Sequence, residues 1–276
     1  MAIEAVLFDL DDTLIEEEDS AKWALAQTCL IAAARHGLDS RRLVDLVRQH
    51  AGDLWRSVDT ITYCRAVGIS SWEGLWARFV GAEDPNLERL RSWAPTYRFK
   101  TWAAALNAFG IHDDTLASEV ANAFPVIRNQ RHVVLPGAVD ILAALRPHAK
   151  LAIISNGSPD LQRQKLRRSG LQKYVDTVIV SGEVGVGKPN PAIFQCALRS
   201  LDVQASKAVM VGDSLTRDVD GAQRAGIRAV WLNRRAVRPA DAKVFPDAEI
   251  RELNDLPRVL ERVDRSWRSE ESVMNP

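Results

Sequence analysis

The residues best suited to chemistry are two aspartates, Asp9 and Asp11, which directly follow the apolar run Ala5–Phe8. Side chains two residues apart in an extended chain project from the same side. Two anions placed there repel each other, and a divalent metal ion, which prefers carboxylate oxygen, is the natural counter-charge. The pair therefore indicates a metal-dependent enzyme. The pattern D-x-D-x-T is short, however, and an acidic turn between a strand and a helix is the alternative interpretation.

A second segment, Ser155-Asn156-Gly157, closes the apolar run Leu151–Ile154. A hydroxyl group followed by backbone N–H groups, with a glycine that permits close approach, suits a phosphate. A plain turn between a strand and a helix would have the same composition.

A third segment places Lys188 in a Gly/Pro-rich loop just before a helix start at Asn190-Pro191. A lysine held this way suits an anion or a carboxylate, with a solvated surface lysine as the alternative. The spacing from Gly182 to Lys188 imitates a P-loop, but Pro189 stands where that motif needs a Ser or Thr to bind magnesium. A nucleotide hydrolase of the P-loop kind is therefore not expected.

A fourth segment, Gly212-Asp213-Ser214, ends the apolar run Ala208–Gly212, and Asp218 follows near the next helix start. Either aspartate alone would be read as a helix cap. All four segments, however, follow predicted strands, and open α/β sheets bind ligands at the carboxyl ends of their strands. Their coincidence favours a single site.

The elements that must position these residues form an α/β fold. From Val133 onward, short apolar runs alternate with amphipathic patterns, which predicts βαβ units in a Rossmann-like, doubly wound parallel sheet. The predicted strands are Ala5–Phe8, Leu151–Ser155, Thr177–Ser181, Ala208–Gly212 and Ala229–Leu232. The predicted helices of this part begin at Ser158-Pro159, ending near Gly170, and at Asn190-Pro191, and a third ends before Gly226, with a late helix around Leu253–Val263.

Between about Ile15 and Asn129 the pattern is helical, with helices expected at Ser20–Arg35, Asp39–His50 and Thr96–Phe109. We therefore expect a discontinuous catalytic core at 1–15 and 130–265, an inserted all-helical cap at 16–129 that acts as a lid, and a flexible tail at 266–276.

Six of the eight tryptophans fall in the cap, and we interpret most of them as core anchors, with one or two lining a substrate pocket as the alternative. Five charged residues of the cap and its return linker could reach a leaving group, although solvated charge is the simpler interpretation: Arg98, Lys100, Arg128, Arg131 and His132. Cys29 and Arg35 have the spacing of a thiol-based phosphatase loop, but the residues between them are helical and lack glycine, so Cys29 is expected in the core.

Composition narrows the class of partner and compartment. Lys+Arg and Asp+Glu balance at 36 each, which gives no electrostatic reason to expect nucleic acid or a membrane surface as a partner. The start of the chain shows no signal peptide, and no apolar run is long enough for a membrane span. Three widely spaced cysteines indicate reduced thiols in a cytoplasmic protein. The oligomeric state stays open.

Taken in order, the motifs D-x-D-x-T, S-N-G, G-K-P and G-D-S-x3-D resemble those of the haloacid dehalogenase-like hydrolase superfamily, over about residues 3 to 235. The helical insert is similar to the C1-type cap of its phosphatase branch, although it is longer than usual.

The resemblance implies a role for each site residue. Asp9 would be the nucleophile, Asp11 the general acid/base and Lys188 a stabiliser of charge. The phosphate would be bound by Ser155, Asn156, Gly157 and Lys188. Mg²⁺ would be bound by Asp9, Asp213 and the backbone carbonyl of Asp11, and Asp218 would support it through water or Lys188.

The main hypothesis is a Mg²⁺-dependent phosphatase that hydrolyses a small phosphorylated metabolite through an aspartyl-phosphate. A metal-independent 2-haloacid dehalogenase is the first alternative. Dehalogenases of the superfamily usually lack an acid at the position of Asp11, which favours the phosphatase. A catalytically silent binding domain is the second alternative.

Overall fold

The computed structural model describes residues 3–238 and 243–263. The chain divides into two compact units. Of the described residues, the sheet unit takes in those up to Glu16, those from Val134 to Ser155, and those after Lys165. The helical unit takes in Glu17–Val133 together with Asn156–Lys165. The predicted tail at 266–276 lies outside the described residues.

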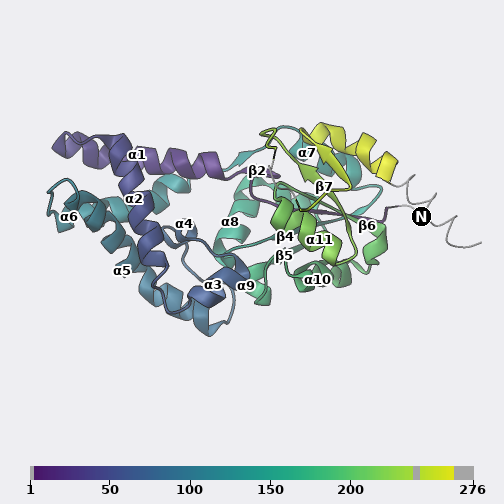
Figure 1. The fold of residues 1–276 in the computed structure, drawn as a ribbon, viewed down its shortest axis with the longest axis horizontal. Helices are drawn as coiled ribbons and strands as arrows, with labels where there is room; N and C mark the ends of the chain where they lie inside the picture. The colour runs from purple at the N-terminus through teal and green to yellow at the C-terminus, as the bar shows by residue number, and fades with distance from the viewer. Residues whose placement is uncertain (1–2, 239–242, 264–276) are drawn as a thin grey trace, which may run out of the picture. The chain divides into compact units, whose positions relative to one another are not determined.

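The sheet unit is built on a parallel six-stranded sheet in the order β5-β4-β1-β6-β7-β8. Figure 1 labels β4, β5, β6 and β7 in this sheet. Its strands are β1 (Ala5–Phe8), β4 (Lys150–Ser155), β5 (Thr177–Val180), β6 (Ala208–Gly212), β7 (Arg228–Leu232) and β8 (Ala248–Ile250). The predicted α/β fold class is confirmed. The edge strand β8 is not predicted, and Ser181 begins a short helix instead of ending β5.

The two faces of the sheet bury two separate apolar cores because strand side chains alternate. In β1, Ala5 and Leu7 face one core, and Val6 and Phe8 face the other. Both faces are covered by helices, as expected for strands that read as continuous apolar runs. The first core includes residues of α10 (Pro191–Leu201) and α11 (Asp220–Arg224), and the second includes residues of α7 (Ala138–Leu145), α8 (Pro159–Ser169) and a helix at 256–263.

Several helix boundaries follow from local signals in the sequence. Asn190 accepts a hydrogen bond from the N–H of Ala192 at 3.0 Å, with Pro191 in the first turn of α10. Gly170, with φ +70°, ends α8 in the left-handed conformation. Helix α7 is not predicted. The remaining short elements are β2 (Ile15–Glu16), β3 (Val133–Val134), α9 (Ser181–Val184) and the single turns Leu171–Tyr174, Ala205–Lys207, Leu215–Val219 and Leu253–Asp255.

The helical unit contains α1 (Glu18–His36), α2 (Ser40–Trp55), α3 (Ile61–Val67), α4 (Ser71–Gly74), α5 (Pro85–Asn107) and α6 (Asp114–Arg128). Three of these are predicted with shifted ends, and α3, α4 and α6 are not predicted. Helix α5 starts 11 residues before the predicted Thr96, because Asp84 caps it and Pro85 opens it.

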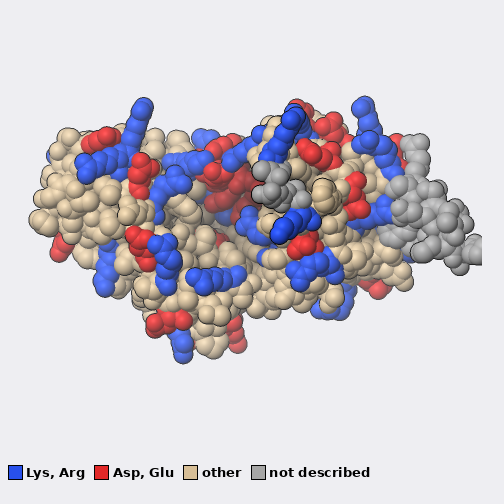
Figure 2. Space-filling view, in the orientation of Figure 1, with Lys and Arg blue, Asp and Glu red and all other residues tan. Residues whose placement is uncertain are grey.

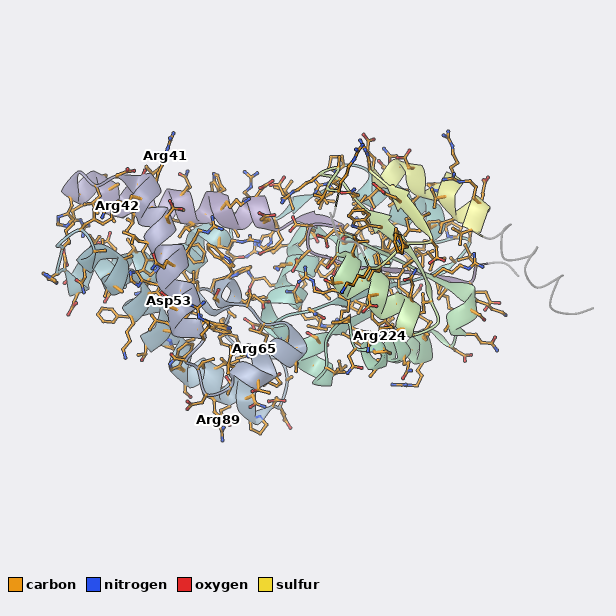
Figure 3. The ribbon with its side chains drawn as sticks, viewed as in Figure 1. Arg41, Arg42, Asp53, Arg65, Arg89 and Arg224 are labelled. Carbon is orange, nitrogen blue, oxygen red and sulfur yellow. The ribbon has the colours of Figure 1, made fainter. Side chains whose placement is uncertain are left out.

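Helix α2 shows why these segments form a bundle. Its apolar residues recur every three to four positions, and Leu43, Val47, Ala51 and Trp55 are buried on one face. Arg41 and Asp53, labelled in Figure 3, lie on the exposed face of the same helix.

The tryptophans of the helical unit are core residues, as predicted. Trp55, Trp76 and Trp102 are buried, and Trp23, Trp72 and Trp93 pack against the same cluster. Cys29 is fully buried in α1, which confirms it as a core residue.

The expectation of solvated charge is confirmed for Lys100 and wrong for Arg128, whose exposed fraction is 1%. Its guanidinium lies 4.6 Å from the Trp76 ring and pairs with Glu17. Arg98 is partly buried and donates from Nε to the carbonyl of Gly74 at 3.0 Å. Arg131 and His132 are also only partly exposed.

On the face shown in Figure 2, basic and acidic side chains of the described residues are interspersed, in keeping with the zero net charge. Among the helices within 3–238 and 243–263, none has the length and apolar character needed to cross a membrane.

Candidate active site

Asp9 lies at the carboxyl end of the central strand of the sheet unit. Phe8, one residue before it, is in register with Ile153 of β4 and with Val211 of β6. The backbone N–H of Asp9 donates to the carbonyl of Val211 at 2.9 Å, so the hydrogen bonds between β1 and β6 continue one residue past the end of β1. The residue as a whole is 6% exposed, and its carboxylate accepts a hydrogen bond from the Thr13 hydroxyl at 3.2 Å. Asp9 is therefore a fixed, nearly buried carboxylate.

Lys188 provides the cation that the buried carboxylates need. Its Nζ forms an ion pair with Asp9 and lies 2.7 Å from a carboxylate oxygen of Asp218. Burial lowers the pKa of Lys188, but the carboxylates of Asp218 and Asp9 more than offset this effect, and the pKa lies above its ordinary value. Lys188 is therefore charged at neutral pH and is not a solvated surface lysine.

Three carboxylates converge at this edge of the sheet. Asp9, Asp213 and Asp218 each offer an oxygen within 4.8 Å of the others. Burial raises the pKa of Asp9 to about 6 against the opposing charge of Lys188. Burial and the neighbouring charges of Asp9 and Asp218 raise the pKa of Asp213 to about 8. Such a set of hard oxygen donors fits a divalent cation, which would offset the mutual repulsion that adds to the effect of burial on these pKa values.

Gly212 makes room for one of these carboxylates. A Cβ atom on Gly212 would lie 2.4 Å from the carboxylate carbon of Asp218, closer than any real Cβ contact. Asp218 also accepts a hydrogen bond from the N–H of Ser214 at 2.9 Å, and the Trp231 indole N–H donates to the carbonyl of Asp213 at 2.8 Å. The glycine of the G-D-S motif is thus required by packing within the site.

The remaining predicted site residues lie in different surroundings. Ser155 is buried at the end of β4, which pairs with β1. Asp11 is partly exposed just beyond β1, and its charge contributes to the raised pKa of Asp9. Asn156 and Gly157 follow Ser155 directly in the chain, but they cluster with the helical unit.

Two further residues contribute to the site, although the sequence analysis assigns neither of them a role. Thr13 belongs to the first motif, and its hydroxyl donates to Asp9. Arg217 lies inside the last motif, and its charge lowers the pKa of Asp213 against the stronger effect of burial. Its position three residues after Ser214, to which its Nε donates at 3.3 Å, is the signal that could have identified it.

Comparisons with known proteins agree with this geometry. A family model described as haloacid dehalogenase-like hydrolase matches residues 3–226. The chain is 37% identical over 252 residues to a phosphoserine phosphatase of Thermus thermophilus, covering 91% of this chain and 96% of that protein. It is 31% identical over 274 residues to a glyceraldehyde 3-phosphate phosphatase of Methanopyrus kandleri, covering 94% of this chain and 98% of that protein.

Among solved structures, a 2-haloacid dehalogenase from Pseudomonas syringae pv. Tomato superposes with a TM-score of 0.59 at 30% identity, covering 94% of this chain and 99% of that one. The site agrees with these matches, because Asp9 and Asp213 directly follow strands of the parallel sheet and Lys188 pairs with Asp9. The family match over most of the chain shows that this chain belongs to the haloacid dehalogenase-like hydrolase family.

Proposed function

We propose that this chain is a Mg²⁺-dependent phosphatase that hydrolyses the phosphate monoester of a small metabolite. The observation that carries the proposal is the contact of Asp9 with Lys188 inside a cluster of three carboxylates. A nucleophilic carboxylate must approach a dianionic phosphate, and it can do so only where cations offset the charge. Full-length relatives that are named as phosphatases support the same class.

The metal would be held by Asp9, Asp213 and the backbone carbonyl of Asp11, with Asp218 supporting it through water or through Lys188. When bound, Mg²⁺ would neutralise negative charge on the phosphate being transferred.

In the first step, a carboxylate oxygen of Asp9 attacks phosphorus and the bond to the leaving oxygen breaks. Asp11 gives its proton to that oxygen, so the alcohol departs and an aspartyl-phosphate forms on Asp9. Lys188 offsets charge on the transferred group, and Ser155, Asn156 and Gly157 bind its oxygens.

In the second step, Asp11 removes a proton from water, which attacks the phosphorus of the aspartyl-phosphate. Inorganic phosphate leaves, and Asp9 and Asp11 return to their starting states.

The choice between phosphatase and dehalogenase rests on Asp11. In a dehalogenase, halide leaves without a proton, so no acid is needed next to the nucleophile. The aspartate at position 11, close enough for its charge to affect Asp9, supports phosphate transfer. Dehalogenation with halide release is the second candidate function, because one similar solved structure is named as a 2-haloacid dehalogenase.

For substrate and setting, we propose a small phosphorylated metabolite in the cytoplasm, with the expected cap at 16–129 selecting the leaving group. The first substrates to test are phosphoserine and glyceraldehyde 3-phosphate, because relatives aligned along nearly their whole length carry these names. The cysteines Cys29, Cys64 and Cys196 are all free, which supports a reducing compartment.

The test is a panel of phosphorylated metabolites and p-nitrophenyl phosphate, with and without Mg²⁺, on the wild type and on Asp9→Asn. The expected result is Mg²⁺-dependent phosphate release that Asp9→Asn abolishes without loss of fold. Full activity in Asp9→Asn would refute the assignment of Asp9 as the nucleophile. Halide release without metal would favour the dehalogenase. Absence of activity toward every substrate of the panel would favour the alternative that the chain is a catalytically silent binding domain.

A further inference from the structure

Glu73 in α4 is a buried carboxylate that the proposed chemistry does not use. Its exposed fraction is 7%. One oxygen, Oε2, accepts from the N–H of Ser70 at 3.1 Å, and the Ser70 hydroxyl accepts from the N–H of Glu73 at 3.3 Å. This reciprocal capping box fixes one end of the carboxylate at the start of α4.

The other oxygen of Glu73 faces the loop that follows Ser155. Oε1 accepts from the backbone N–H of Ser158 at 3.1 Å and from the side-chain amide of Gln162 at 3.1 Å. Ser158 lies 85 residues further along the chain, so the contact joins two distant segments of the helical unit. Hydrogen bonds to an ionised acceptor are about twice as strong as neutral ones.

The loop is shaped around this contact. Gly157 has φ +136°, and a Cβ atom there would lie 2.3 Å from Oε1 of Glu73. A Cβ atom on Gly68 would lie 2.7 Å from the side-chain amide nitrogen of Asn156. Both predicted phosphate-binding residues after Ser155 therefore pack directly against residues 68–73.

A second carboxylate fixes the next part of the same loop. Asp160 accepts from the N–H groups of Arg78 and Phe79 at 2.7 and 3.1 Å, and the Ser158 hydroxyl donates to it at 2.6 Å. Arg98 donates to the carbonyls of Gly74 and Ala77, in the segment that directly precedes Arg78 and Phe79. Residues 156–160 are thus fixed by hydrogen bonds to Glu73, Arg78 and Phe79. The segment that carries these three residues is fixed in turn by Arg98.

We propose that Glu73 is a positioning residue that sets the conformation of Asn156 and Gly157 and so the affinity for the substrate phosphate. The proposal rests on the proposed phosphatase function. It assigns phosphate affinity to a side chain of the helical insert that touches neither the phosphate nor the metal.

The test compares Glu73→Ala and Glu73→Gln with the wild type, with p-nitrophenyl phosphate as substrate and inorganic phosphate as competitive inhibitor. Glu73→Ala removes both acceptors, and because small displacements of binding groups have large effects, KM and the Ki for phosphate should rise about tenfold. The kcat should change much less. Glu73→Gln keeps an oxygen for Ser158 and should recover most of the affinity.

Asp113→Ala is the matched control. Asp113 caps α6 by accepting from the N–H of Leu116 at 2.8 Å, and it neighbours His36, so its loss weakens the helical unit without touching residues 156–162. It should lower Tm and leave KM and Ki unchanged.

Unchanged or lower KM and Ki in Glu73→Ala, beside an active wild type, would overturn the positioning role alone. An inactive wild type would instead contradict the proposed function, and direct titration of inorganic phosphate into the Mg²⁺-loaded wild type and Glu73→Ala would then decide the positioning role by itself. Equal affinities in that titration would overturn it.

Discussion

Replacing Lys188 with methionine should destabilise the protein because it removes the cation between two buried carboxylates. The Lys188 side chain is 2% exposed, and its partners Asp9 and Asp218 are 9% and 2% exposed. Removing one partner of a buried ion pair costs about 3–5 kcal/mol, since the remaining charge stays buried without compensation. At roughly 2–4 °C per kcal/mol for a chain of this size, the Tm of the metal-free protein should fall by about 6–20 °C.

Lys207→Met is the matched control for this change. Lys207 pairs with Glu4 in the same unit at 2.5 Å, but the two side chains are 24% and 46% exposed. Exposed pairs contribute about 0.2–1 kcal/mol, so the control should move Tm by no more than roughly 4 °C. Thermal unfolding of both variants at pH 8 in chelator measures the difference.

The pH dependence adds a second readout to the same assay. Burial raises the pKa of Asp9 to about 6, so lowering the pH lets Asp9 take up a proton and removes its buried charge. The deficit of Lys188→Met should therefore shrink from pH 8 toward pH 5. Equal Tm losses in Lys188→Met and Lys207→Met at pH 8 would refute the buried charge network.

Three further predictions concern the carboxylates and their packing. The pKa of Asp213 is raised to about 8, so between about pH 4 and 8 the folded state binds more protons than the unfolded state, and stability falls as pH rises. Asp213→Asn should therefore raise the Tm of the metal-free protein at pH 8 and abolish the stabilisation by Mg²⁺; a lower Tm would contradict the sign. Asp11→Asn should lower kcat about 10²–10⁴-fold with Tm unchanged, and a wild-type kcat would remove it as the acid/base. Gly212→Ala places a Cβ 2.4 Å from Asp218, so it should lower the free energy of unfolding in denaturant by about 1–3 kcal/mol and weaken Mg²⁺ binding in titration calorimetry. Gly52→Ala is the control: the nearest atom to its Cβ lies at 3.7 Å, and neither quantity should change.

The sequence predicts the sheet well because its central strands are buried on both faces. Such strands must be apolar throughout, so Ala5–Phe8 and Ala208–Gly212 are found with the bounds that the structure has. The edge strand Ala248–Ile250 escapes prediction because only Ile250 in it is buried. A three-residue strand with a single buried apolar residue is too short to show the alternation of apolar and polar residues that identifies a strand.

The convergence of the candidate site is predictable for the same reason. Asp9, Lys188 and Asp213 follow strands or precede helices, and the carboxyl ends of parallel strands meet at one edge. The position of Asp218 is harder to predict, because its place beside Lys188 depends on the space that Gly212 leaves open.

The charged residues of the helical unit could not be placed from sequence. Arg128 is buried because Glu17, 111 residues earlier, and the ring of Trp76 receive its guanidinium. Glu73 was not indicated at all, although Ser70 three residues before it is the signature of a capping box. That signature predicts a helix start, but the contact with Ser158 exists only in the folded chain.

Phosphorylation of Asp9 during turnover can be tested directly by trapping the covalent intermediate. Enzyme mixed with p-nitrophenyl phosphate and Mg²⁺ is quenched in acid and reduced with borohydride, which converts an aspartyl-phosphate to homoserine, and peptides are mapped by mass spectrometry. We predict homoserine at position 9 in the wild type and none at Asp11 or Asp213. Phosphate release without homoserine at position 9 would contradict Asp9 as the nucleophile.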